Sequence, residues 1–159
     1  MFSVAIISDL HDWHSAQIEY SLKKYCKKIL KVSFNELSLN FKKKMITDNE
    51  FINNVDGVWV RFFNGGTLEE ITTKLTILHL LRKSNIYVHN TASSIEKTVD
   101  KVRTTGLLSI NKIKSPETVV YFKSKKKKPT LKKNSKYLIK PIFGSQGKNI
   151  LMVNNSEDL

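Results

Sequence analysis

The chain has 159 residues, of which 40% are hydrophobic, which is enough for one ordinary domain or for a domain and part of a second. No run of eighteen or more apolar residues occurs, and the apolar run at residues 4–7 is too short for the core of a signal peptide. The composition excludes a disordered tail, and we expect a soluble, cytoplasmic protein with no membrane partner.

The formal net charge is +13 and the isoelectric point is about 9.8, values that suggest a nucleic-acid partner. The charge is uneven, because the lysine-rich segment at residues 123–136 contains no Asp or Glu. Such a run is more often a solvated loop than a polyanion site, and no series of aromatic residues accompanies it for base stacking. Nucleic-acid binding through residues 123–136 is therefore kept as an alternative function.

Strand and helix signals alternate from the beginning of the chain. Residues 4–7 are a continuous apolar run, typical of a buried parallel strand. Ser15 can cap an amphipathic helix that follows, with an apolar face that extends to Ile29 at spacings of three and four. Residues 32–39 alternate as a strand does, and residues 42–54 are polar enough for a loop or a short helix.

A second strand and helix follow in the same order. Residues 57–63 predict a central strand, and a turn with two glycines comes after it. Thr67 and Glu70 form a capping box that begins a helix reaching about Arg82, before a short strand at residues 86–89. Because parallel strands need crossover connections, this pattern predicts an α/β fold with a mostly parallel sheet and helices on both faces.

The remaining residues predict a smaller set of elements. A helix is expected at residues 100–110, a strand at residues 117–122, and two strands at residues 137–141 and 149–153 around a glycine turn. The turn is not a Walker A loop, because its glycine spacing is wrong and no Ser or Thr follows the lysine. Two glycines still let the backbone approach an anion closely, and Lys140 on the strand supplies positive charge, so the segment predicts a phosphate contact.

The segment after the first strand has three interpretations. Asp9 and His11 form an Asp-x-His pair of the kind that begins metal-dependent phosphoesterases, but such sites need further ligands that the chain lacks. In the second interpretation His11, Trp13 and His14 line a crevice at the carboxyl end of the strand, where open α/β sheets bind ligands. In the third they are only the start of a helix, and the sequence does not decide between the last two.

Several of these segments together resemble the RimK-like branch of the ATP-grasp ligases. That branch has an Asn after a strand, an Asp-Lys pair before a helix, a strand start with Pro and Thr, and then Lys-Pro-x-x-Gly-Ser-x-Gly. The corresponding residues occur here in this order: Asn90, Asp100 with Lys101, Pro116 with Thr118, and Lys140 through Gly147. Pro116 and Thr118 depart slightly from the pattern, because Glu117 separates them. The segment around Arg61 and Thr67 is also similar, most of all to ligases that modify methanopterin-type cofactors.

This resemblance implies a Rossmann-like, pre-ATP-grasp α/β domain over residues 1–90 and the first, truncated part of an ATP-grasp domain over residues 91–159. It implies ATP and Mg²⁺ as cofactors. The reaction would join a small-molecule or peptide carboxylate to an amino acid such as glutamate through an acyl phosphate. The Mg²⁺ ligands would lie beyond Leu159, so we do not expect this chain alone to catalyse ligation. The resemblance also allows a homo-oligomer of the full-length protein.

The resemblance assigns roles to particular residues. Lys101 and Lys140 would contact the ATP phosphates, and a mobile loop of Gly144, Ser145, Gln146 and Gly147 would cover them. Substrate binding is assigned separately, to His11, Trp13 and His14 from their place after the first strand, and to Arg61, which lies near the end of the third strand in the segment that resembles the family. No residue is assigned a catalytic role, and the sequence does not say which carboxylate and which amine are joined.

Overall fold

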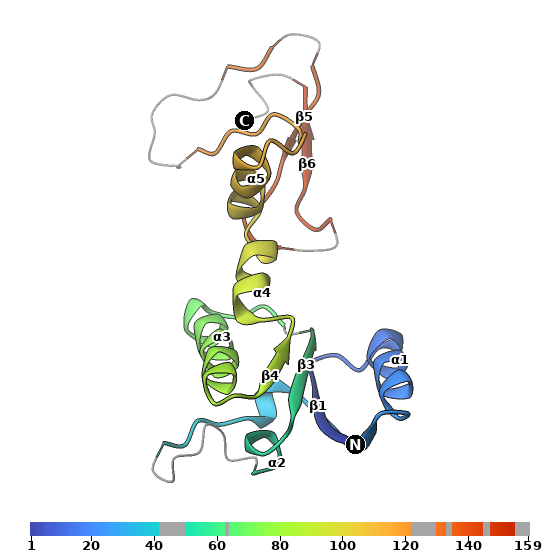
Figure 1. Ribbon diagram of the computed structural model, residues 1–159. Helices are drawn as coiled ribbons and strands as arrows, with labels where there is room; N and C mark the ends of the chain where they lie inside the picture. The colour runs from blue at the N-terminus through green and yellow to red at the C-terminus, as the bar shows by residue number, and fades with distance from the viewer. Residues whose placement is uncertain (42–49, 63, 122–129, 133–134, 145–146, 155–159) are drawn as a thin grey trace. The chain divides into compact units, whose positions relative to one another are not determined.

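The computed structural model describes residues 1–41, 50–62, 64–121, 130–132, 135–144 and 147–154 (Figure 1). The chain divides into two compact units, Met1–Ser94 and Ile95–Leu159. The first contains a four-stranded sheet and the second a two-stranded sheet. Within the described part of the chain, no helix has both the length and the hydropathy that crossing a bilayer requires.

The first unit is built on a parallel sheet with the strand order β2-β1-β3-β4. Helix α1 lies on one side of this sheet and helix α3 on the other (Figure 1). The predicted parallel α/β sheet with helices on both faces is therefore confirmed. Its elements are β1 (Phe2–Ser8), α1 (Trp13–Leu22), β2 (Cys26–Val32), the 3₁₀ helix η1 (Phe34–Glu36), α2 (Glu50–Asn53), β3 (Gly57–Phe62), α3 (Leu68–Lys83) and β4 (Tyr87–His89).

The core of the first unit is apolar and lies between the sheet and α3. Ala5 pairs in register with Val58, and Ile7 with Val60, and all four side chains are buried. The buried residues of α3 are Ile77, Leu78 and Leu81. Burying this much apolar surface is the main force that holds an α/β unit together.

Helix α3 begins where the sequence predicts it. Thr67 is the N-cap: its hydroxyl accepts a hydrogen bond from the Glu70 backbone N–H at 3.2 Å, and Glu70 accepts one from the Thr67 N–H at 2.8 Å. Acidic residues in the first turn and basic residues in the last turn also complement the helix dipole. The capping box and the strand before it are thus confirmed, except that Phe63 lies outside the described residues.

Two predictions in the first unit are wrong. The predicted helix reaching Ile29 ends instead at Leu22, and Cys26–Val32 forms strand β2, which pairs with β1. Pairing with a distant strand outweighs the helical spacing, and the lysines of β2 are exposed on an edge strand, where charge is favourable. Of the strand expected at residues 32–39 only Val32 is in a strand, as the end of β2, because Ser33 and Glu36 form a capping box that begins η1.

The second unit contains a helix and a hairpin. Asp100 caps α5 (Lys101–Ile110) by accepting hydrogen bonds from the backbone N–H groups of Val102 and Arg103. Helix α4 (Ala92–Val99) precedes α5 in the chain, and the two units divide within it. Strands β5 (Tyr137–Ile139) and β6 (Leu151–Val153) pair antiparallel, as predicted, although each is shorter than expected. The strand expected at residues 117–122 is not formed at residues 117–121, which are exposed and pair with no described strand. Phe122 lies outside the described residues.

Candidate functional site

Lys101 is held against the glycine turn of the second unit. Its Nζ donates a hydrogen bond of 2.7 Å to the carbonyl oxygen of Gly144. Its backbone N–H donates another, of 3.1 Å, to the carbonyl of Ile142. The first residue of α5 and the segment after β5 therefore lie side by side, so that two of the predicted phosphate-binding positions are brought together.

The backbone of the turn has conformations that favour glycine. Gly144 has φ of +133° and Gly147 has φ of +71°, and Asn149 follows with φ of +58°. A Cβ atom at Gly144 would lie 3.5 Å from Cγ of Pro141 and 4.0 Å from Nζ of Lys101. The absence of a side chain there keeps the turn close to the lysine, a geometry in which backbone N–H groups can face an anion.

The structure describes fewer contacts for the other predicted phosphate-binding residues. Lys140 directly follows β5 and is exposed, and among the described residues it has no hydrogen-bond or ion-pair partner. Ser145 and Gln146 lie outside the described residues, as does most of the lysine-rich segment at 123–136. Lys140 is therefore available to a ligand, whereas Lys101 already has one backbone acceptor.

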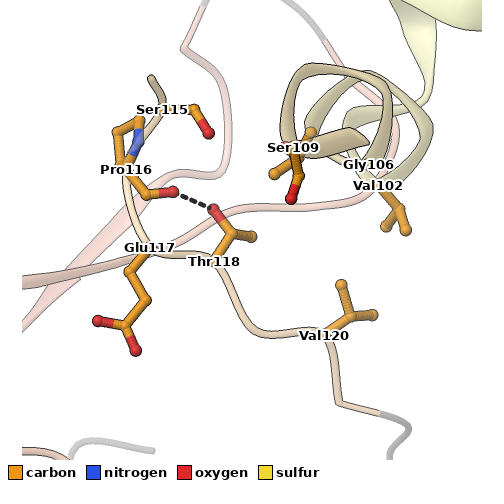
Figure 2. A pocket seen from close by; sticks show the side chains of 9 residues that line it. Val102, Gly106, Ser109, Ser115, Pro116, Glu117, Thr118 and Val120 are labelled. Carbon is orange, nitrogen blue, oxygen red and sulfur yellow. Dashed lines mark hydrogen bonds between the residues drawn. The ribbon is translucent and has the colours of Figure 1, made fainter. Parts of the chain in front are cut away.

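A pocket of about 460 Å³ lies elsewhere in the second unit, between α5 and the segment that follows it (Figure 2). Ser109 of α5 faces this segment, and Thr118 donates a hydrogen bond of 3.0 Å to the carbonyl of Pro116 (Figure 2). None of the predicted phosphate-binding residues lines this pocket. The glycine turn and the pocket are thus different places on the second unit.

In the first unit, Asp12 joins two of the predicted substrate-binding residues. Its Oδ2 atom accepts hydrogen bonds from Arg61 Nη2 at 3.0 Å and from His14 Nδ1 at 3.1 Å. The rings of Trp13 and His14 are arranged edge to face, with centroids 5.2 Å apart. His11 is exposed. Three of the four predicted substrate-binding residues therefore form one cluster, at the start of α1 and the carboxyl-terminal part of β3.

Asp12 is also the N-cap of α1, a role that the sequence pattern suggested for Ser15. The Ser15 backbone N–H donates to Asp12 Oδ1 at 2.8 Å, and Ser15 occupies the third helical position and completes a capping box. This backbone hydrogen bond and the neighbouring His14 and Arg61 hold the pKa of Asp12 below its usual value. The carboxylate is therefore charged at neutral pH and fixes the positions of both basic side chains.

The side chain of Asp9 is fully buried and joins the carboxyl ends of three strands. Its Oδ1 accepts from Ser33 Oγ at 2.6 Å and from the Phe34 N–H at 2.8 Å, both after β2. Its Oδ2 accepts from the Asn64 N–H at 2.8 Å, after β3, and from Lys74 Nζ of α3 at 3.1 Å. Burial alone would raise the pKa of Asp9, but these hydrogen bonds outweigh burial and lower it.

Both carboxylate oxygens of Asp9 are engaged by groups of the protein. Each carboxylate oxygen already accepts two hydrogen bonds, which is the number it can normally take. Among the described residues, no group of three or more His, Cys, Asp or Glu side chains could hold a metal ion. Asp9 therefore has a structural role that the sequence pattern did not predict.

Asn90, which contributed to the resemblance, also has a structural contact within the first unit. It follows β4 with φ of +57°, and its Nδ2 donates a hydrogen bond of 2.7 Å to the carbonyl of Val60 in β3. Asn is among the residues that adopt this left-handed conformation most readily. The side chain thus fastens the end of β4 to its neighbour.

No protein-family model matches the chain, and a search of curated proteins finds none that matches it in sequence.

Proposed function

We propose that residues 1–159 are the N-terminal part of an ATP-dependent carboxylate-amine ligase of the RimK-like ATP-grasp type. The observation that carries the proposal is the hydrogen bond from Lys101 Nζ to the Gly144 carbonyl, which puts a cation beside a turn with two positive-φ glycines. The ordered motifs of the sequence and the parallel sheet of the first unit agree with this proposal.

The described residues fit the phosphates of a nucleotide. Lys101 and the exposed Lys140 provide two cations, and the turn at Gly144 and Gly147 provides backbone that an anion can approach closely. Bound ATP would supply the γ-phosphoryl group that converts the substrate carboxylate into an acyl phosphate with release of ADP, and the attacking amine would then displace inorganic phosphate. On this proposal Lys101 exchanges its carbonyl partner for a phosphate oxygen, and Lys140 adds a second charge-assisted contact.

The described residues do not fit Mg²⁺ in the same way, because they contain no cluster of carboxylate ligands. The proposal therefore assigns phosphate binding to this part of the chain and assigns no metal ligand to it. The roles of its residues are to bind the nucleotide and to orient it.

The test is a titration of the ¹⁵N-labelled chain with ATP, followed by two-dimensional NMR. We expect saturable shifts of the backbone signals of Lys101, Gly144 and Gly147. A charge-assisted hydrogen bond contributes roughly 1.5–3 kcal/mol, so Lys140→Ala should weaken ATP binding by about 10- to 100-fold. Lys140 is exposed and has no described partner, so this substitution should leave the fold intact.

Lys148→Ala is the matched control, because Lys148 is an exposed lysine close to the same turn but outside the motif. It should change the affinity for ATP much less than Lys140→Ala does. Equal effects of the two substitutions would show that ATP responds only to the general positive charge. Shifts that avoid Lys101 and the glycine turn would refute the proposal outright.

A further inference from the structure

The first unit carries a second cluster of polar and aromatic side chains, separate from the phosphate-binding residues. It consists of Asp12, Trp13 and His14 at the start of α1 and Arg61 on β3, and we call it the Arg61 cluster. Its members come from two elements that are far apart in sequence and meet at one carboxylate oxygen. Packing of the apolar core does not explain these contacts, because Trp13 and His14 are exposed and Arg61 is only partly buried.

The position of the cluster in the sheet favours ligand binding. In the order β2-β1-β3-β4, the chain leaves β1 toward one edge of the sheet and leaves β3 toward the other. Strands β1 and β3 therefore flank the switch point of the topology, and their carboxyl ends diverge there into separate loops. In open α/β sheets, ligands bind in the crevice at this point.

The chemistry of the side chains indicates the kind of ligand. Arg61 uses Nη2 to bind Asp12, and its remaining N–H groups have no partner among the described residues. A guanidinium with free donors binds planar anions such as carboxylates in a bidentate way. Trp13, whose side chain is 69% exposed, offers an apolar ring beside the His14 ring, on which a planar group can stack.

We propose that the Arg61 cluster binds a carboxylate that carries an aromatic or other planar group. The carboxylate pairs with Arg61, the planar group lies on Trp13, and Asp12 is a negative charge beside them that competes with the ligand for Arg61. The choice of a carboxylate rests on the proposed ligase function and deepens it, because the cluster would then hold the substrate that is activated.

Asp12 also makes the proposal testable, because its negative charge repels an incoming anion. Asn is as good an N-cap as Asp, so Asp12→Asn keeps the cap of α1 while it removes the negative charge. At contact distance in water this repulsion corresponds to roughly a fivefold change in affinity. Asp12→Asn should therefore strengthen binding of the anion by about fivefold, whereas loss of a purely structural residue would not.

The experiment is an NMR titration of the full chain with benzoate, and with benzamide as the uncharged probe of the same shape. For a ligand of this size we expect a Kd for benzoate of about 1 mM. Saturable shifts should appear at the Trp13 indole N–H and at Arg61, and benzamide should cause much smaller ones. Arg61→Gln should weaken benzoate binding by about 10- to 100-fold.

Lys31→Gln is the matched control, because Lys31 is a cation of the same unit that pairs with Glu19 on the surface. It should leave benzoate binding unchanged. Unchanged binding in Arg61→Gln, or weaker binding in Asp12→Asn, would overturn the proposal, and the second result does so even if Arg61→Gln fails to fold. ATP shifts at Lys101 and Gly144 report on the other unit, so a failure here is distinguishable from a failure of the proposed ATP site.

Discussion

Replacing Asp9 with Asn changes one atom of the carboxylate that joins three strand ends. The amide nitrogen is a donor, so whichever way the side chain turns, two of the four hydrogen-bond donors that face it lose their acceptor. Lys74, whose side chain is only 12% exposed, loses its counter-ion at the same time. Removing one partner of a buried ion pair costs about 3–5 kcal/mol.

We expect the lower end of this range, about 3 kcal/mol, because Lys74 also donates to the carbonyl oxygen of Asn64 at 3.3 Å. That is a large fraction of the roughly 5–15 kcal/mol by which a typical domain is stable. Urea unfolding followed by tryptophan fluorescence measures this loss of stability, since both tryptophans, Trp13 and Trp59, belong to the first unit.

Glu19→Gln is the control for the loss of one negative charge in the same unit. Glu19 pairs with Lys31 at 2.9 Å on the surface, and exposed pairs contribute roughly 0–1 kcal/mol. Combining Asp9→Asn with Lys74→Met should show a coupling free energy of about 1–3 kcal/mol. If Asp9→Asn costs no more than Glu19→Gln, or if the coupling is zero, then Asp9 does not hold the strand ends together and the reasoning fails.

Two further predictions concern acid and the glycine turn. The pKa of Asp9 is lowered from its ordinary value of 3.8, so its contribution to stability is complete above that value and is lost as the pH falls through the lower folded-state pKa. The free energy of unfolding should therefore fall in acid, and fall less steeply in Asp9→Asn; parallel pH profiles would contradict this. In the second unit, Gly144→Ala should destabilise the hairpin by about 1–3 kcal/mol because of its positive φ. Gly106→Ala, inside α5 with open space around it, should stabilise its helix by about 0.5–1 kcal/mol. Amide hydrogen exchange measures both, and the same sign for both would refute the argument.

The parts of the fold that could be predicted are those whose signals are local. The side chains of Thr67 and Glu70 each accept a hydrogen bond from the other's backbone N–H within one turn. Asp100 likewise accepts hydrogen bonds from nearby backbone N–H groups, so a few residues are enough to predict both helix starts. The apolar run of β1 likewise identifies a buried strand without knowledge of its neighbours. For such elements the sequence carries the physical reason directly.

The remaining errors arise where distant residues decide the structure. Cys26 and Ile29 fit a helical stripe as well as a strand, and only pairing with β1 selects the strand. In the sequence Asp9 resembles a metal ligand, but in the structure the loops after β2 and β3 bring three hydrogen-bond donors to it and helix α3 brings a fourth. The cluster around Asp12 has the same cause: the sequence suggests Trp13, His14 and Arg61, but it does not show that Asp12 bonds His14 and Arg61.

The strand order also has a consequence for synthesis on the ribosome. Strand β1 lies between β2 and β3, so one of its edges can be paired as soon as β2 emerges while the other waits for β3. At about 5–20 residues per second, the residues from the end of β2 at Val32 to the end of β3 at Phe62 take roughly two to six seconds to add. For that interval the nascent chain presents an unpaired apolar edge, and we expect this to be when it most needs a chaperone.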